Sequence, residues 1–145
     1  MKALYSTRAT STGGGRNGAA STADGRLSVA LSIPKEMGGD GGPGTNPEQL
    51  FAAGYSACFM GAFRGAARKL KVNVPEATAV TATVRFLDRE DGVGYSIAAA
   101  LAVKAPGLDQ ATIEQVMALA HDICPYSHLI RNVHDVELTA VAEAA

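Results

Sequence analysis

The stretch FAAGYSACFMGAF, residues Phe51 to Phe63, decides how the rest of the chain is organised. Its side chains are almost all apolar or small. The preceding Thr45-Asn46-Pro47-Glu48 supplies a polar cap, a proline for the first helical turn and an acid beside the positive end of the helix dipole. We therefore predict a central, buried helix that is apolar nearly all round. Its C-terminal end is marked by basic residues (Arg64, Arg68, Lys69 and Lys71).

The composition is that of a globular protein. The chain has 145 residues, of which 47% are hydrophobic and 19% charged, and this predicts a single domain over residues 1–145 with a substantial core. Thirteen basic and fourteen acidic residues give a net charge of −1. This balance offers no electrostatic basis for a nucleic-acid partner, so we expect none.

The apolar segments are too short for a membrane. The longest, Phe51–Phe63, has 13 residues, and the N-terminal MKALYSTRATSTGGG has no apolar run of signal-peptide length. We therefore expect a cytoplasmic protein without a membrane partner. The cytoplasmic thiol pool keeps structural disulfides reduced, so the two cysteines, Cys58 and Cys124, are either buried small hydrophobes or a working redox pair.

Turn signals divide the first part of the chain into strands. A β-rich segment over Lys2–Thr10 and the alternating RLSVALSI, residues 26–33, are separated by turn signals at Asn17-Gly18 and Asp24-Gly25. This pattern predicts three strands in meander order. The glycine-rich MGGDGGPGTNP, residues 37–47, predicts a flexible surface loop before the helix.

The second half predicts three strands and two further helices. VTATVRFLDRE (residues 80–90) and YSIAAALAV (95–103) flank an Asp91-Gly92 turn, and residues 135–144 alternate as a last strand. Asp109 can cap a helix that Pro125 interrupts, and Pro125 can open a short helix over residues 125–132. The first of these helices carries an apolar stripe (Ile113, Val116, Met117, Ala120 and Cys124). The order βββαββααβ predicts an α+β fold of six strands and two main helices.

Two apparent motifs, one for dinucleotide binding and one for zinc, are excluded by the residues around them. Gly13, Gly15 and Gly18 match the dinucleotide-binding pattern G-x-G-x-x-G, but a turn and a strand follow where that motif requires a helix. Four possible ligands have a spacing, H-x2-C-x3-H-x5-H, that matches no zinc template (His121, Cys124, His128 and His134). We therefore predict surface or capping histidines, with no metal and no bound cofactor.

Cys58 needs a nearby cation if it is to react. A lone thiol inside an apolar helix has a raised pKa and is inert. A guanidinium about 4 Å away, at an effective dielectric near 20, is worth up to about 4 kcal/mol, which is enough to leave a thiolate at neutral pH. Arg16, in the glycine turn GGGRNG, is the candidate, although it can also be a solvated turn residue. Glu48 can likewise be no more than an acid of the first helical turn.

Three blocks in the right order, GGRNG, NPEQLFAAGYSACF and HDICPYS, resemble the organic hydroperoxide resistance proteins, a branch of the bacterial OsmC-type thiol peroxidases. The resemblance covers essentially the full length. It implies a peroxidase that reduces alkyl or fatty-acid hydroperoxides to alcohols and works as an intertwined homodimer. It also implies an external dithiol reductant, dihydrolipoamide or a lipoylated protein, in place of a bound cofactor.

The resemblance also assigns roles. Cys58 matches the cysteine that attacks the peroxide and becomes a sulfenic acid, and Cys124 matches the one that then closes a disulfide with it. Arg16 matches the arginine that activates the thiolate, and Glu48 the acid that orients it, in our expectation through a bidentate pair. The alternatives are an OsmC-type peroxidase of broader substrate range and a non-enzymatic binder of apolar small molecules.

The spacing of Glu48 and Cys58 limits how these residues can meet. They are ten residues apart, which is about 15 Å along a straight helix. One guanidinium does not easily reach both. Either the helix bends or breaks, most simply at Gly54, or the partners come from the two chains of a dimer.

Overall fold

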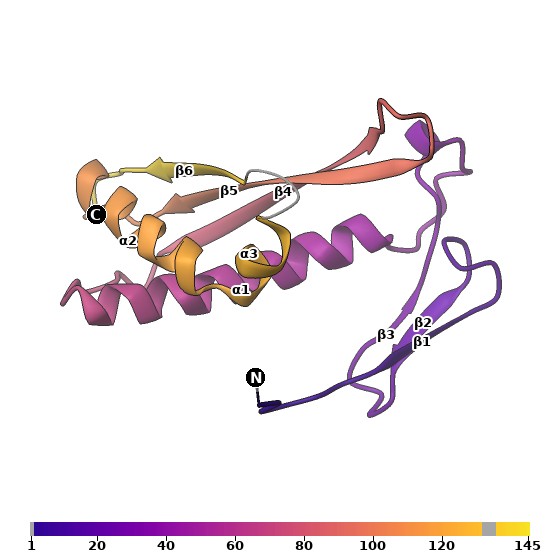
Figure 1. Ribbon diagram of the computed structural model, residues 1–145, viewed down its shortest axis with the longest axis horizontal. Coiled ribbons are helices and arrows are strands. Elements are labelled where there is room, and N and C mark those ends of the chain that lie inside the picture. The colour runs from indigo at the N-terminus through magenta and orange to yellow at the C-terminus, as the bar shows by residue number, and fades with distance from the viewer. Residues whose placement is uncertain (1, 132–135) are drawn as a thin grey trace. The chain divides into compact units, whose positions relative to one another are not determined.

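The computed structural model describes residues 2–131 and 136–145 (Figure 1). Within these residues the chain forms six strands, two long helices, one six-residue helix and one 3-10 turn. The α+β class and the predicted order βββαββααβ are confirmed. His134, one of the residues weighed for a metal site, lies outside the described residues.

The chain divides into two compact units, one up to Leu50 and one from Phe51 onward. The expectation of a single domain over residues 1–145 stays a prediction. In the part of the chain that the structure describes, no helix has the length and apolarity needed to cross a membrane.

The first unit contains the predicted meander. β1 (Ala9–Thr12), β2 (Ala19–Thr22) and β3 (Ser28–Ala30) form an antiparallel sheet in the order β1-β2-β3. The first strand begins at Ala9, so its predicted start at Lys2 is wrong. The physical reason is the register, because Ala9 pairs with Thr22 and β2 ends there. Residues 2–8 therefore have no strand in this sheet to extend along.

The glycine-rich loop is more structured than its sequence suggests. A 3-10 turn over Lys35–Met37 precedes it. Its backbone then returns to the end of β3, since Gly44 N–H donates to Ser32 Oγ at 2.9 Å and Thr45 N–H to Ala30 O at 3.0 Å. These bonds fix the point at which the long helix begins.

α1 (Pro47–Lys69) begins where predicted, with Asn46 as its cap. The N–H of Gln49 donates to Asn46 Oδ1 at 2.8 Å, which satisfies one of the free donors of the first turn. The helix is continuous over its 23 residues, so it does not break at Gly54, and a bend there stays a prediction. Gly54 is instead a point of close approach, because a Cβ there would lie 2.8 Å from the hydroxyl and 3.3 Å from ring carbons of Tyr126.

Burial of α1 is one-sided, which corrects the expectation that it is buried all round. One face is buried in the second unit (Tyr55, Phe59, Phe63, Ala66 and Ala67). Ala53, Ala57 and Gly61 lie on another face and are exposed in this chain. The small size of these exposed side chains explains why the sequence appears apolar all round although only one face contributes to the core.

The second unit has its own mixed sheet. β4 (Ala79–Asp88) and β5 (Tyr95–Lys104) are antiparallel, and β6 (Glu137–Val141) pairs with β5 in parallel. α2 (Gln110–Ile123) starts at the predicted cap, with Thr112 N–H donating to Asp109 Oδ1 at 2.9 Å. Pro125 then begins α3 (Pro125–Ile130).

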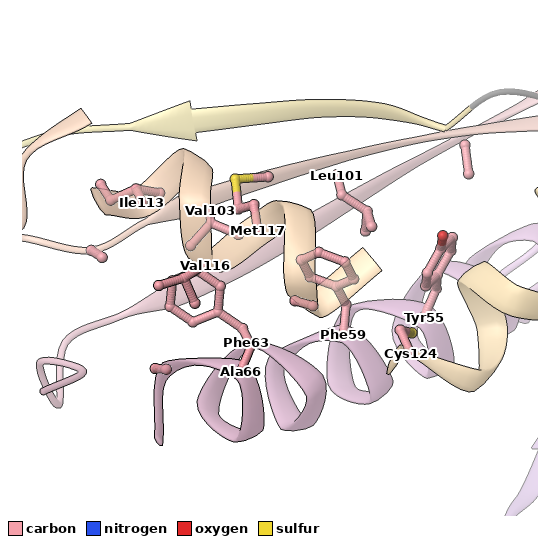
Figure 2. Close-up of a cluster of buried hydrophobic side chains, with 14 residues drawn as sticks. Tyr55, Phe59, Phe63, Ala66, Leu101, Val103, Ile113, Val116, Met117 and Cys124 are labelled. Carbon is pink, nitrogen blue, oxygen red and sulfur yellow. The ribbon is translucent and has the colours of Figure 1, made fainter. Parts of the chain in front are cut away.

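The core of this unit lies between α1, α2 and β5 (Figure 2). Phe59 and Phe63 of α1 pack with Leu101 and Val103 of β5. All five residues of the predicted stripe of α2 are buried (Ile113, Val116, Met117, Ala120 and Cys124). The 3.6-residue period of the sequence thus places Cys124 at the end of a core-facing stripe.

Two glycines of α1 test the close approach of Tyr126. We expect Gly54→Ala to lower the free energy of unfolding by about 1–3 kcal/mol, because the new methyl group must displace the Tyr126 ring. Gly65→Ala is the matched control, since its Cβ would lie at ordinary contact distance, 3.8 Å from Arg68 and Ile123, and should raise stability by about 0.5–1 kcal/mol. Urea unfolding measures both, and an equal gain in both variants would contradict the packing described.

Candidate active site

The two thiols meet at the junction of α2 and α3. Cys58 lies in the middle of α1, and Cys124 is the single residue between α2 and α3. Pro125 cannot continue α2, so the backbone of Cys124 is extended, with φ −69° and ψ 123°. The fold thereby brings together two residues that are 66 positions apart, with the Cys124 thiol donating to Cys58 Sγ at 3.6 Å. Both cysteines are free thiols.

Aromatic side chains pack beside this pair. The rings of Phe51, Tyr55 and Tyr126 form a mutual cluster, with centroids 5.7–5.8 Å apart. Tyr126 contributes twice, because its backbone N–H also hydrogen-bonds to the sulfur of Cys58. The surroundings of the thiols are therefore apolar and largely aromatic.

A buried hydrogen bond accompanies the thiol contact. Tyr55 Oη and Ser127 Oγ are 2.8 Å apart, and both residues are fully buried. Sequence reasoning missed this pair. Its only sequence signal is position, since Tyr55 stands three residues before Cys58 and Ser127 three residues after Cys124.

The pKa of Cys58 is raised in this environment. Burial is the largest cause; the N–H of Tyr126 lowers the pKa, and the neighbouring Cys124 thiol raises it. The second unit by itself therefore keeps Cys58 protonated at neutral pH, as expected for a thiol in an apolar helix. Burial likewise raises the pKa of Tyr55, which keeps its hydroxyl neutral.

Arg16 and Glu48 form a bidentate ion pair in the first unit. The guanidinium donates from Nη1 to Oε2 at 2.9 Å and from Nη2 to Oε1 at 2.8 Å. Glycine conformations shape the turn that presents Arg16, with Gly15 at φ +70° and Gly18 N–H donating to Gly15 O at 3.0 Å. The expected two-pronged geometry is thus present, which distinguishes Arg16 from a merely solvated turn residue.

The pair stabilises the charges of both members. Hydrogen bonding to Arg16 is the largest cause of a lowered pKa of Glu48, and hydrogen bonding to Glu48 raises the pKa of Arg16. The carboxylate is the more buried partner, with a side chain 14% exposed against 40% for Arg16. Glu48 therefore fixes a guanidinium that remains partly open to solvent. Activation of Cys58 by Arg16 stays a prediction, since the pair belongs to the first unit and the thiols to the second.

His121 and His128 are the two histidines that the structure describes. In the described ranges, 2–131 and 136–145, no group of three or more His, Cys, Asp or Glu side chains is placed to hold an ion. His128 Nδ1 lies 2.8 Å from Arg131 Nη2. The Nδ1 of His121 is buried and has no hydrogen-bond partner among these residues, and burial lowers the pKa of its ring.

Comparison with known proteins identifies close relatives. The family model described as OsmC-like protein matches residues 38–139. An organic hydroperoxide resistance protein of Xanthomonas axonopodis pv. citri is 44% identical over 138 residues, which cover 95% of each chain. The crystal structure of an organic hydroperoxide resistance protein of Legionella pneumophila superposes with a TM-score of 0.86 at 41% identity, over 99% of this chain and 100% of that one. For OhrB of Bacillus subtilis the TM-score is 0.87 at 34% identity, over 96% and 100% of the two chains.

The Arg16–Glu48 pair predicts an acid-dependent contribution to stability. Since Arg16 lowers the pKa of folded Glu48, the contribution is fully present above the unfolded value of about 4.3 and is lost as pH falls through the lower folded value. We expect the difference in unfolding free energy between wild type and Glu48→Gln to be constant from about pH 7 to 5 and to shrink below about pH 4. Urea unfolding at each pH measures it.

The control is the same substitution in an Arg16→Ala background. There the acid dependence of the Glu48→Gln difference should largely disappear, because the partner that lowers the pKa is gone. An acid dependence of equal size in both backgrounds would show that Arg16 does not set the pKa of Glu48.

Proposed function

Because the chain belongs to the family of OsmC-like proteins, we propose that it is a cysteine-based peroxidase that reduces alkyl or fatty-acid hydroperoxides to alcohols. Family membership supports an oxidoreductase that acts in peroxide detoxification. The two-cysteine mechanism rests on the 3.6 Å separation of the Cys58 and Cys124 sulfurs. Both cysteines are free thiols here, and two thiols this close can be oxidised to a disulfide and reduced again.

The reaction begins at Cys58. Its thiolate attacks the distal oxygen of the hydroperoxide, the O–O bond breaks, and the alkoxide leaves as an alcohol after taking a proton. Cys58 is now a sulfenic acid. The thiol of Cys124 attacks that sulfur, water leaves, and a Cys58–Cys124 disulfide forms. An external dithiol, dihydrolipoamide or a lipoylated protein, reduces the disulfide and restores both thiols, so no bound cofactor is needed.

Arg16 supplies the missing charge. Burial raises the pKa of Cys58, so a thiolate at neutral pH requires a cation beside it. The guanidinium held by Glu48 stabilises the thiolate and polarises the O–O bond. Its planar fork allows it to bind the carboxylate with one edge while it presents other N–H groups to the sulfur and the peroxide.

The protein acts as an intertwined homodimer in this proposal. α1 is continuous, so no break shortens the ten residues, about 15 Å, between Glu48 and Cys58. A break in α1 is thus excluded, and in this proposal the groups meet from two chains rather than through a bend at Gly54. The exposed small residues Ala53, Ala57 and Gly61 of α1 would let a second chain approach closely.

The aromatic cluster favours an apolar substrate. Phe51 and Tyr126, which are only partly buried, offer apolar surface beside the thiols, from which a hydrocarbon chain gains and hydrogen peroxide does not. The deciding experiment is steady-state consumption of cumene hydroperoxide by the purified protein with dihydrolipoamide. Turnover supports the peroxidase, and binding of the hydroperoxide without turnover would support a non-enzymatic binder. Equal turnover of hydrogen peroxide would favour a peroxidase of broader range.

Arg16→Lys separates charge from geometry. Lysine keeps the positive charge but lacks the fork, so we expect the second-order rate with cumene hydroperoxide to fall roughly 10- to 100-fold, the equivalent of one or two charge-assisted hydrogen bonds. Arg26→Lys is the matched control, because Arg26 sits in the next turn and its side chain is 90% exposed. In Arg16→Ala the pKa of Cys58, read from pH-dependent alkylation, should rise further. An unchanged pKa would leave Arg16 a structural turn residue.

Replacement of the two cysteines should give different oxidation products. After one equivalent of cumene hydroperoxide, intact-protein mass spectrometry should find the wild type about two mass units lighter, as a disulfide, and Cys124→Ser about sixteen heavier, as a sulfenic acid. Cys58→Ser should be unchanged, since it lacks the nucleophile. Equal reactivity of the two variants would mean that neither thiol has a distinct role.

A further inference from the structure

Two of the contacts that join α1 to the α2–α3 junction are made by polar side-chain atoms, and they lie one helical turn apart. One is the contact between the Cys58 and Cys124 sulfurs. The other is the 2.8 Å hydrogen bond between Tyr55 Oη and Ser127 Oγ. Each member of the hydrogen bond stands three residues from one of the cysteines, on the same element or the one that follows it.

The position of Cys124 relative to α1 depends on such contacts, because its backbone hydrogen bonds are made within α2 and α3. Its N–H donates to Ala120 O and its carbonyl accepts from His128 N–H, each at 2.9 Å. Its extended backbone ends α2 and directly precedes α3, so neither of these bonds ties it to α1. α3 has only six residues, far fewer than an isolated helix needs for stability in water. Its attachment to α1 therefore comes from packing and from side-chain bonds.

The Tyr55–Ser127 bond is well suited to that task. Both residues are fully buried, where a hydrogen bond is directional and an unpaired hydroxyl is costly. The ring of Tyr126 also packs on Gly54, Phe51 and Tyr55, but such ring contacts are less directional than a hydrogen bond. Loss of the bond would let the α2–α3 junction, and the sulfur of Cys124 with it, sample positions farther from Cys58.

We propose that Tyr55 and Ser127 are positioning residues for disulfide formation, an inference that rests on the peroxidase function proposed above. The Cys58 sulfenic acid has two fates. The Cys124 thiol can attack it, forming the S–S bond and releasing water, or a second hydroperoxide molecule can oxidise it to a sulfinic acid and leave as an alcohol. The hydrogen bond favours the first fate because it keeps the Cys124 sulfur within reach.

The first oxidation should not depend on this bond. The hydrogen bond joins the two hydroxyls to each other, and the side-chain hydrogen-bond contact of Cys58 is with Cys124 rather than with either hydroxyl. Their loss should therefore change the partition of the sulfenic acid and leave the rate of its formation unaltered. A general loss of stability would not produce that selective effect.

The test compares Tyr55→Phe, Ser127→Ala and the double variant with wild type. Each protein, with dihydrolipoamide, is exposed to rising cumene hydroperoxide, and mass spectrometry gives the concentration at which half of Cys58 is sulfinic acid. We expect this concentration to fall about tenfold in each single variant, the factor expected for one hydrogen bond. In the double variant the concentration should fall by the same factor, because all three variants lack the same hydrogen bond.

The double variant also controls for loss of stability. Each single variant leaves one buried hydroxyl without its partner, whereas the double variant leaves none. Thr78→Val is the matched control, because it removes a buried hydroxyl that has no partner in the described part of the chain. Its half-sulfinic concentration should equal that of wild type. Near-ultraviolet circular dichroism establishes that each variant is folded.

The outcomes separate this inference from the function on which it rests. A wild type whose Cys58 is not oxidised by the hydroperoxide would overturn the peroxidase itself. A wild type that forms the disulfide, together with a folded double variant that keeps the wild-type half-sulfinic concentration, would overturn only the positioning role. Losses that add in the double variant would likewise overturn it, since the two hydroxyls would then act separately.

Discussion

The structure depends on the packing of α1 against the junction of α2 and α3. That packing includes the fully buried Tyr55 and Ser127, and it places the sulfurs of Cys58 and Cys124 3.6 Å apart. Neither cysteine is unusual alone. Each lies in apolar surroundings in which free cysteine is an ordinary core residue. Their juxtaposition turns two core residues into a possible redox pair.

Charge is the second requirement, and burial works against it. The same packing that aligns the sulfurs removes Cys58 from water and raises its pKa. A peroxidase built on this core must therefore bring a cation to the thiol from elsewhere. The Arg16–Glu48 pair has the required properties, since the guanidinium is held by two hydrogen bonds and remains partly exposed. In the proposed mechanism the core positions the two sulfurs, and the turn around Arg16 supplies the positive charge.

Local signals in the sequence predict most of the fold. The caps at Asn46 and Asp109, the alternation of β4 and the stripe of α2 depend on neighbouring residues, and each is found where expected. The errors arise where distant residues decide. Gly54 resembles a helix breaker in the sequence, but in the structure it makes room for the ring of Tyr126. β1 is shorter than its composition predicts because its partner strand β2 ends at Thr22. The bond between Tyr55 and Ser127 spans 72 positions and has no local signal at all.

Thiol stoichiometry tests the central claim, the use of Cys58 and Cys124 as one two-electron donor, most directly. The reduced protein is mixed with a limiting amount of tert-butyl hydroperoxide, the alcohol formed is quantified, and the remaining thiols are titrated after denaturation. Reduction by the pair predicts that both thiols disappear for each molecule of alcohol produced. Alcohol formation with only one thiol lost, or thiols that remain intact in the presence of the hydroperoxide, would contradict it.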